Sequence, residues 1–158
     1  MSTISSENNS LRRVRTIADY QFGAGAGEAL FPEEVNFTLS KTKRVRYITL
    51  NRDRLATVRA HDGRLTLSRL GAERLGAALP APAYRVTIIA EVAEYILKGK
   101  NAMAKHVIAA DVGIRAGDEV LVCDPEGNLL GNGNAVLSGE EMPAFDYGVA
   151  VEIRRGRK

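Results

Sequence analysis

The stretch YILKGKNAMAKHVIAADVGIRAGDEVLVCDPEGNLLGNGNAVLS, residues 95–138, decides the fold of the second half of the chain. Its apolar spacing predicts a short amphipathic helix that ends at Gly99, followed by a basic loop over residues 100–105. A turn at 115–118 then leads into a strand over 119–124, and a turn at 125–128 leads into another strand. The stretch contains no cluster of reactive side chains. This order of elements favours a surface that binds a partner over a site that performs chemistry.

The bulk composition predicts a soluble globular protein. At 158 residues, with 45% hydrophobic and 26% charged residues, the chain has room for one ordinary domain or two small ones. No apolar run approaches the roughly 18 residues that span a bilayer, and the polar N-terminus does not read as a secretory signal. Cys123 is the single cysteine, so no internal disulfide can form, and no Cys/His spacing suggests a metal site. We therefore expect a cytoplasmic protein without a cofactor.

The net charge of +3 conceals an asymmetry along the chain. Residues 1–80 carry 13 basic against 8 acidic side chains, whereas residues 81–158 carry 9 against 11. The second half nevertheless ends in a basic tail, residues 154–158. Basic charge gathered in this way predicts a localised contact with a polyanion.

The first half is predicted to be a small α+β domain over residues 11–80, after a disordered lead-in over 1–10. Apolar residues at i, i+3 and i+4 predict a helix over 11–22, and the glycine-rich residues 23–27 are expected to form a flexible connector. From residue 35 to 67 the apolar pattern alternates, which predicts four short antiparallel strands, closed by a short helix before Pro80. A secondary basic surface is expected at the first hairpin, formed by Lys41, Lys43, Arg44 and Arg46. His61 is expected to be a turn residue.

A linker over 81–84, rich in proline and alanine, separates this domain from a second one over residues 85–158. A strand at 86–89, a helix at 90–98, a short strand at 107–108, the hairpin of 119–137 and a closing strand at 149–154 predict a small, partly closed β-barrel with one or two short helices. Gly131, Gly133 and Gly139 are expected to mark bulges or bends.

Several motifs of this second half, in order, resemble those of the PUA domain, the RNA-binding module of pseudouridine synthases and archaeosine transglycosylases. They are residues 98–102 (KGKNA), 104–107 (AKHV), 114–120 (IRAGDEV), 133–138 (GNAVLS) and 148–151 (GVAV). The first half, at 15–27, 55–63 and 71–75, is similar to the small domain that precedes the PUA domain in archaeal tRNA-guanine transglycosylase, or archaeosine synthase. The chain departs from the family at Met103 and His106, where aromatic residues are more frequent.

The resemblance implies where RNA would bind. In the PUA family, RNA lies across the helix and the glycine-containing loop beside the last strand. The matching positions here are Gly99, Lys100, Asn101, Ala102, Lys105, His106, Arg154 and Arg155. Lys100 and Lys105 are expected to contact phosphates, whereas Gly99 and Ala102 are expected to let the RNA backbone approach closely.

No residues in the sequence support catalysis. The neighbouring carboxylates 118–119 and 140–141 point to opposite faces of a strand, and Ser138 has no activating partner in the sequence. A transglycosylase barrel of roughly 200 residues does not fit in this chain. The leading hypothesis is a non-enzymatic protein that docks structured RNA, foremost tRNA, for modification in an archaeosine-type pathway.

Two alternatives remain beside this hypothesis. The first is a protein-interaction subunit that holds a separately encoded catalytic transglycosylase-like chain through the sheet of the first domain. The second is a stand-alone RNA-modifying enzyme, for which the sequence offers no activated nucleophile.

Overall fold

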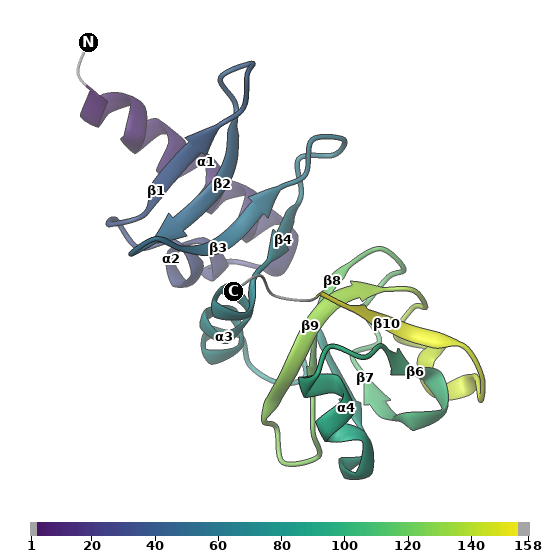
Figure 1. Ribbon diagram of the computed structural model, residues 1–158. Coiled ribbons are helices and arrows are strands. Elements are labelled where there is room, and N and C mark those ends of the chain that lie inside the picture. The colour runs from purple at the N-terminus through teal and green to yellow at the C-terminus, as the bar shows by residue number, and fades with distance from the viewer. Residues whose placement is uncertain (1–2, 155–158) are drawn as a thin grey trace. The chain divides into compact units, whose positions relative to one another are not determined.

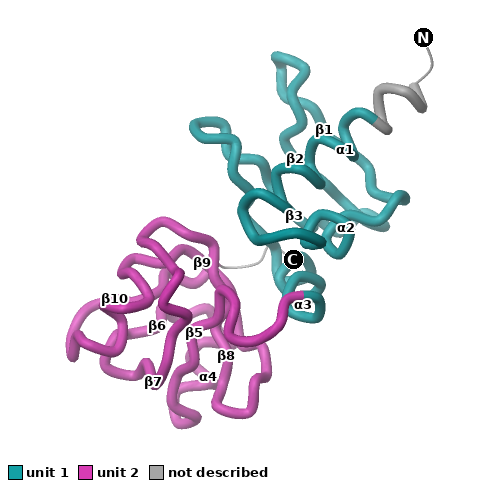
Figure 2. The backbone as a smooth tube through the Cα atoms, turned by 180° about the vertical axis from the view of Figure 1, so that it is seen from behind, with its two compact units in different colours: residues 1–78 teal, residues 79–158 magenta. Residues whose placement is uncertain are grey.

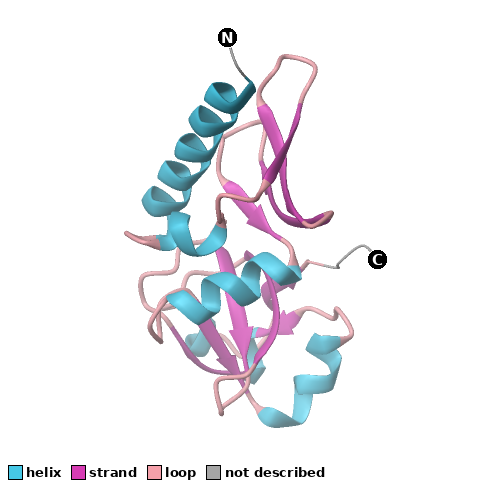
Figure 3. Cartoon of the chain, turned by 90° about the vertical axis from the view of Figure 1, so that its left-hand side faces the viewer, coloured by secondary structure: helices cyan, strands magenta, loops and turns pink. Residues whose placement is uncertain are grey.

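The computed structural model describes residues 3–154, and their side chains from residue 9 onward. The chain divides into two compact units, residues 1–78 and 79–158 (Figure 2). Each unit combines helices with a mainly antiparallel sheet (Figure 3), which confirms the predicted α+β class. Among the helices of residues 3–154, none is long and apolar enough to cross a membrane.

The first unit is a four-stranded antiparallel sheet with helices before and after it. Its strands pair in chain order, and helix α1 runs along one face of the sheet (Figure 1). The elements are α1 Thr3–Phe22, α2 Ala26–Leu30, β1 Asn36–Leu39, β2 Val45–Leu50, β3 Asp53–Val58, β4 Leu65–Leu67 and α3 Arg69–Ala78.

Alternating side chains form the core of this unit. Ile48, Ala56 and Leu67 occupy matching positions on β2, β3 and β4, and all three are buried. Because their register places them side by side on one face, they form a continuous apolar row. Gln21 of α1 joins the helix to β4: its amide oxygen accepts the backbone N–H of Leu65, and its amide nitrogen donates to the Leu65 carbonyl. This buried amide is therefore satisfied within the fold.

The structure differs from two expectations for the N-terminal region. Residues 3–10 form the first turns of α1, where a disordered lead-in was expected. They contain neither proline nor glycine, so nothing in them stops the helix, whereas the apolar stripe that predicted its start begins only at Leu11. The expected flexible connector over 23–27 instead leads into α2, and a Cβ atom on Gly27 would lie 2.3 Å from the Arg15 carbonyl oxygen. Glycine there allows α1 and α2 to pack backbone against backbone.

The second unit is built on a six-stranded sheet in the order β6-β10-β9-β8-β5-β7. The two edge strands, β6 and β7, are consecutive in the chain and are joined by one short 3-10 helix, η2. The sheet must therefore curl until its edges approach each other, as in a partly closed barrel. The elements are β5 Arg85–Ile88, η1 Ala90–Val92, α4 Ala93–Leu97, β6 Ala102–Met103, η2 Ala104–His106, β7 Val107–Ala110, β8 Glu119–Cys123, β9 Leu129–Ala135, η3 Met142–Ala144 and β10 Val149–Ile153.

At two glycines of the second unit, the chain packs directly against the backbone of another segment. A Cβ atom on Gly133 would lie 1.9 Å from the Glu152 carbonyl oxygen, and one on Gly139 would lie 1.9 Å from the Asp111 carbonyl oxygen. Gly133 pairs in register with Ile153 of β10. The register shift of this hairpin lies elsewhere, between Val122 and Cys123. Of the bulges or bends expected at the three glycines, the register shift lies beside Gly131, whereas Gly133 is required by the proximity of the neighbouring strand.

Candidate nucleic-acid interface

The basic loop begins at a well-defined helix end. The expected single helix over 90–98 is split into η1 and α4, and α4 ends at Leu97. The N–H of Gly99 donates to the Ile96 carbonyl, and the N–H of Lys100 donates to the Tyr95 carbonyl, each at 2.9 Å. With Gly99 at a φ of 92°, this is a Schellman motif. The direction in which the loop leaves the helix is therefore fixed by the backbone, with Lys100 exposed at its start.

Asn101 and Ala102 attach this loop to the last strand. The Asn101 Oδ1 atom accepts the backbone N–H of Ile153 at 3.0 Å, and Ala102 pairs with Val151 of β10. Ala102 is only 1% exposed and lies in the apolar core. Its small side chain therefore serves the packing of β6, and it does not form part of the outer surface.

Lys100 and Lys105 lie along one edge of the sheet. Both lysines are exposed, and they flank β6 in the chain. Strand β6 is the edge strand that pairs with β10 (Figure 1). Five residue steps separate them, so their Cα atoms are at most about 18 Å apart. His106 follows in η2 and is half-buried. The expected loop residues 99–106 thus form one continuous segment, which we call the β6 edge.

Arg154 has a structural partner that the sequence did not reveal. Its NH2 group lies 2.6 Å from one carboxylate oxygen of Glu119, and its Nε lies 3.3 Å from the other. The Glu119 side chain is 4% exposed and also accepts a hydrogen bond from the Asn132 amide. A buried carboxylate is costly unless a positive charge lies beside it. The Arg154 guanidinium supplies that charge to Glu119, so its positive charge is already engaged within the fold. Arg155 lies outside the described residues.

Two further carboxylates of the second unit, Asp118 and Glu141, also have structural roles. Asp118 accepts the backbone N–H of Arg115 in the turn before β8. Ser138 and Glu141 form a reciprocal capping box, in which each side chain accepts the backbone N–H of the other residue. Within residues 3–154, no three His, Cys, Asp or Glu side chains gather closely enough to hold a metal ion.

The secondary basic surface lies in the first unit, at the tips of two hairpins. Lys41, Arg44 and Arg46 line a groove of about 800 Å³ between the β1–β2 turn and the β3–β4 turn, while Lys43 does not line it. The opposite wall contributes Arg59 and His61, which the sequence analysis did not assign to this surface. Only the side-by-side arrangement of the hairpins brings these cations together, so no local pattern could have predicted their proximity.

One carboxylate, Asp62, moderates the charge of this groove. Its two oxygens bind Nε and NH2 of Arg59 at 3.1 and 2.7 Å, and one of them also accepts the Arg64 backbone N–H. Burial alone would raise the pKa of Asp62, but the Arg64 N–H and the Arg59 guanidinium outweigh it and lower the pKa from its ordinary value. Asp62 therefore stays ionised and offsets part of the positive charge. His61 lies in the turn, as expected, 3.5 Å from Asp62.

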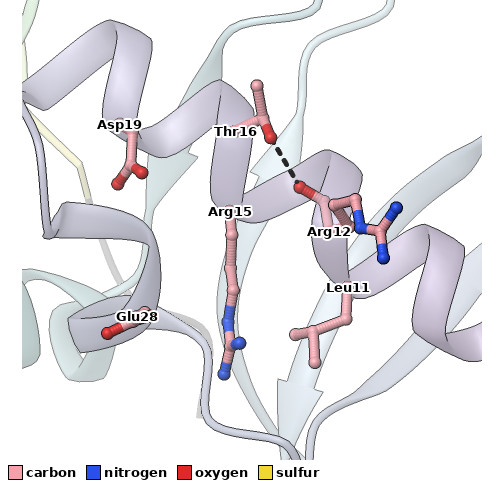
Figure 4. Close-up of a pocket in the computed structure, with 6 residues that line it drawn as sticks. All are labelled: Leu11, Arg12, Arg15, Thr16, Asp19 and Glu28. Carbon is pink, nitrogen blue, oxygen red and sulfur yellow. Dashed lines mark hydrogen bonds between the residues drawn. The ribbon is translucent and has the colours of Figure 1, made fainter.

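A smaller hollow lies between α1 and α2, and four of its six lining residues are charged: Arg12, Arg15, Asp19 and Glu28 (Figure 4). The Nε of Arg15 donates to the Phe31 carbonyl at 2.9 Å, and Asp19 accepts the backbone N–H of Gly27 at 2.7 Å. These two side chains hold α2 against α1. The hollow is thus explained by the packing of the first unit.

Comparison with known families assigns both halves of the chain. Residues 12–82 match the family model for the patch-forming domain C2 of tRNA-guanine transglycosylase. Residues 84–157 match the model for the PUA domain. Together the two matches cover most of the chain.

Curated relatives include archaeal tRNA-guanine(15) transglycosylases. The protein of Pyrococcus abyssi is 48% identical over 148 residues, which are 94% of this chain and 25% of the relative. The protein of Methanothermobacter thermautotrophicus is 41% identical over 157 residues, which are 99% of this chain and 24% of the relative. The chain therefore spans about a quarter of the length of the curated relatives that it matches.

Solved structures show the same fold at low sequence identity. A hypothetical protein of Pyrococcus horikoshii, PH0734.1, aligns with a TM-score of 0.72 at 20% identity and covers 94% of this chain and 90% of its own. A conserved PUA domain protein of Thermoplasma acidophilum aligns with a TM-score of 0.63 at 19% identity and covers 95% and 89% of the two chains. From the family matches and the relatives together, the chain is a PUA-domain protein whose two domains belong to the same families as the C-terminal part of archaeal tRNA-guanine transglycosylase.

Proposed function

We propose that this protein binds structured RNA, with tRNA as the first candidate, through the β6 edge, and that it docks the RNA for modification elsewhere. In this proposal residues 85–158 act as the RNA-gripping PUA domain and residues 11–80 as an accessory domain. The catalytic step belongs to a separate transglycosylase-like chain or domain.

The observation that carries the proposal is the placement of Lys100 and Lys105. Both side chains are exposed at one edge of the sheet, on a backbone that the Schellman motif and the Asn101–Ile153 hydrogen bond fix. Two cations held within about 18 Å of each other by a rigid scaffold can neutralise separate phosphates of one RNA strand. Because the loop is already ordered, RNA binding costs little of its conformational entropy.

The relatives support RNA as the polyanion. Their names describe them as transglycosylases that act at guanine 15 of tRNA, and this chain matches about a quarter of their length. Among the side chains that could suggest catalysis in the second unit, four are engaged in a turn, an ion pair or a capping box: Asp118, Glu119, Ser138 and Glu141. A docking role accounts for both facts.

The decisive experiment measures binding of a fluorescently labelled tRNA by anisotropy at several salt concentrations. Lys100→Ala combined with Lys105→Ala should lower the affinity several-fold and reduce the slope of log K against log salt by about one to two, because two phosphate contacts are lost. Arg12→Ala combined with Arg13→Ala is the matched control. It removes the same charge from exposed positions of α1 and should leave the slope nearly unchanged.

Equal slopes for the lysine variant and the unaltered protein would remove the β6 edge from the proposal. Equal losses of tRNA affinity in the lysine and arginine variants would indicate that binding depends only on the net charge of the protein. Failure of the unaltered protein to bind tRNA at low salt would reject the proposed function itself.

The first unit offers a second candidate function, that of holding a catalytic partner protein. Thr38, Tyr47, Thr57 and Thr66 occupy matching positions on the four strands and lie on the face opposite the buried row. The Arg54 guanidinium stacks over the Tyr47 ring at 3.9 Å, which gives this face an aromatic centre. Co-purification of a transglycosylase-like chain that survives nuclease treatment, and that Arg54→Ala weakens, would support this function.

A further inference from the structure

Two exposed aromatic rings lie in the segment between η3 and β10. Phe145 is 38% exposed and Tyr147 is 75% exposed. Their rings are nearly parallel, with an interplanar angle of 15° and centroids 6.2 Å apart. Large rings left this open to water are available to stack against another flat group.

The pairing of β10 with β6 brings the backbone of this segment beside the β6 edge. Val149 of β10 pairs with Met103 of β6, and the Gly148 carbonyl accepts the backbone N–H of Ala104 at 2.9 Å. Tyr147 directly precedes Gly148, so its backbone lies next to the junction between β6 and η2. Helix η3, which immediately precedes Phe145, also packs against η2, the helix that contains Lys105. The segment that carries the aromatic pair therefore neighbours η2, the helix that contains Lys105.

The backbone that carries the rings is anchored on both sides. Upstream, the Ser138–Glu141 capping box opens η3, Met142 is fully buried, and the Phe145 N–H donates to the Glu141 carbonyl at 3.1 Å. Downstream, Gly148 bonds to η2 and β10 begins. A platform held in this way needs little ordering when a ligand stacks on it.

We propose that Phe145 and Tyr147 form a stacking platform for an unpaired base of the bound RNA, while Lys105 contacts the adjoining phosphate. The inference rests on the RNA-binding function proposed above and specifies that the bound RNA includes a single-stranded nucleotide. Stacking on an aromatic ring suits any base, because every base has a π-face, and it adds contact area that phosphate binding lacks. Asp146, exposed between the two rings, repels phosphate and thus favours a strand whose backbone runs on the Lys105 side.

The test compares two RNA probes that share one duplex: a blunt hairpin, and the same hairpin with a four-nucleotide 3′ overhang that carries 2-aminopurine. Tyr147→Ala should weaken binding of the overhang probe by about five- to hundredfold and abolish the quenching of 2-aminopurine, with little effect on the blunt probe. Tyr147→Phe should retain both properties. Tyr20→Ala is the matched control, because Tyr20 is 95% exposed on α1 and should affect neither probe.

The salt dependence separates this inference from the proposed function. Removing a stacking contact should lower the affinity for the overhang probe without changing the slope of log K against log salt, whereas the lysine variant changes the slope. The inference is rejected if Tyr147→Ala behaves like Tyr20→Ala, or if it weakens both probes equally. It is also rejected if Tyr147→Ala abolishes a self-association seen by sedimentation and leaves RNA binding intact, because the rings would then form a protein interface. If the unaltered protein binds neither probe, the proposed function itself is rejected.

Discussion

Replacing Arg154 by alanine should lower the free energy of unfolding of the second unit. The same substitution should have a smaller effect on the free energy of RNA binding. The substitution removes the two hydrogen bonds of 2.6 and 3.3 Å between the guanidinium and Glu119. The carboxylate, 4% exposed, keeps the Asn132 amide as a hydrogen-bond donor but loses its charged partner. A buried charge without its counter-ion is among the most costly defects that a single substitution can create.

The expected loss of stability is about 2 kcal/mol. Breaking a fully buried ion pair costs roughly 3–5 kcal/mol, and a hydrogen bond to a charged group contributes about 1.5–3 kcal/mol. The Arg154 side chain is itself 37% exposed, so water can enter the vacated space and screen the carboxylate. For a unit of this size, residues 79–158, the loss corresponds to a fall in melting temperature of about 8–16 °C.

Calorimetry is the suitable assay, because the chain has no tryptophan to report unfolding by fluorescence. The transition of the second unit should shift in Arg154→Ala, and the transition of the first unit should not. Glu119→Gln removes the buried charge while keeping the shape of the side chain. Adding it to Arg154→Ala should therefore recover part of the lost stability, and the double-mutant cycle measures the coupling between the two residues.

RNA binding, measured well below the transition, completes this test. With its guanidinium engaged by Glu119, Arg154 should contribute less than one phosphate contact to the salt dependence. An unchanged melting temperature combined with a slope smaller by about one would show that Arg154 contacts phosphate and that the ion pair with Glu119 adds nothing to stability.

Three further predictions concern other parts of the second unit. Burial raises the pKa of the Cys123 thiol, so the native protein should resist alkylation at pH 8, whereas the denatured protein should react with one equivalent of reagent. Gly133→Ala places a methyl carbon 1.9 Å from a backbone oxygen of β10 and should cost several kcal/mol or prevent folding, whereas Gly113→Ala, whose nearest atom is 3.4 Å away, should melt close to the unaltered protein. The Asn128 amide and nearby backbone N–H groups lower the pKa of Asp124, so its stabilising contribution is present above the ordinary value of 3.8 and is lost as the pH falls below that value. Chemical denaturation between pH 2 and 6 should therefore show a smaller acid-induced loss in Asp124→Ala.

Local periodicity predicted most elements correctly. The apolar pattern located β10 within one residue, since a strand over 149–154 was expected and β10 spans Val149–Ile153. The helix end at Gly99 was predictable for a similar reason, since a Schellman motif depends only on neighbouring residues. By contrast, α2 and β6 were missed, because both are shorter than the window over which a period can be recognised.

The candidate interface was only partly accessible from the sequence. Lys100 and Lys105 stand out because they lie in one basic loop beside a helix end. Phe145 and Tyr147 gave no such signal, because only the pairing of β10 with β6 brings their segment next to the basic loop. The family resemblance placed Arg154 among the RNA-binding residues, but its ion pair with Glu119 spans 35 residues of sequence.

The order of residues by itself determined the α+β class, the two-part organisation expected on either side of the prolines, and the cationic loop, because these depend on patterns that repeat over a few neighbouring positions. Only the tertiary structure decided which charges are compensated and which remain exposed, and which distant side chains share an edge. The physical reason is that pairing between strands brings together residues that are remote in the chain, and no local pattern encodes the partner or the register that the whole fold selects.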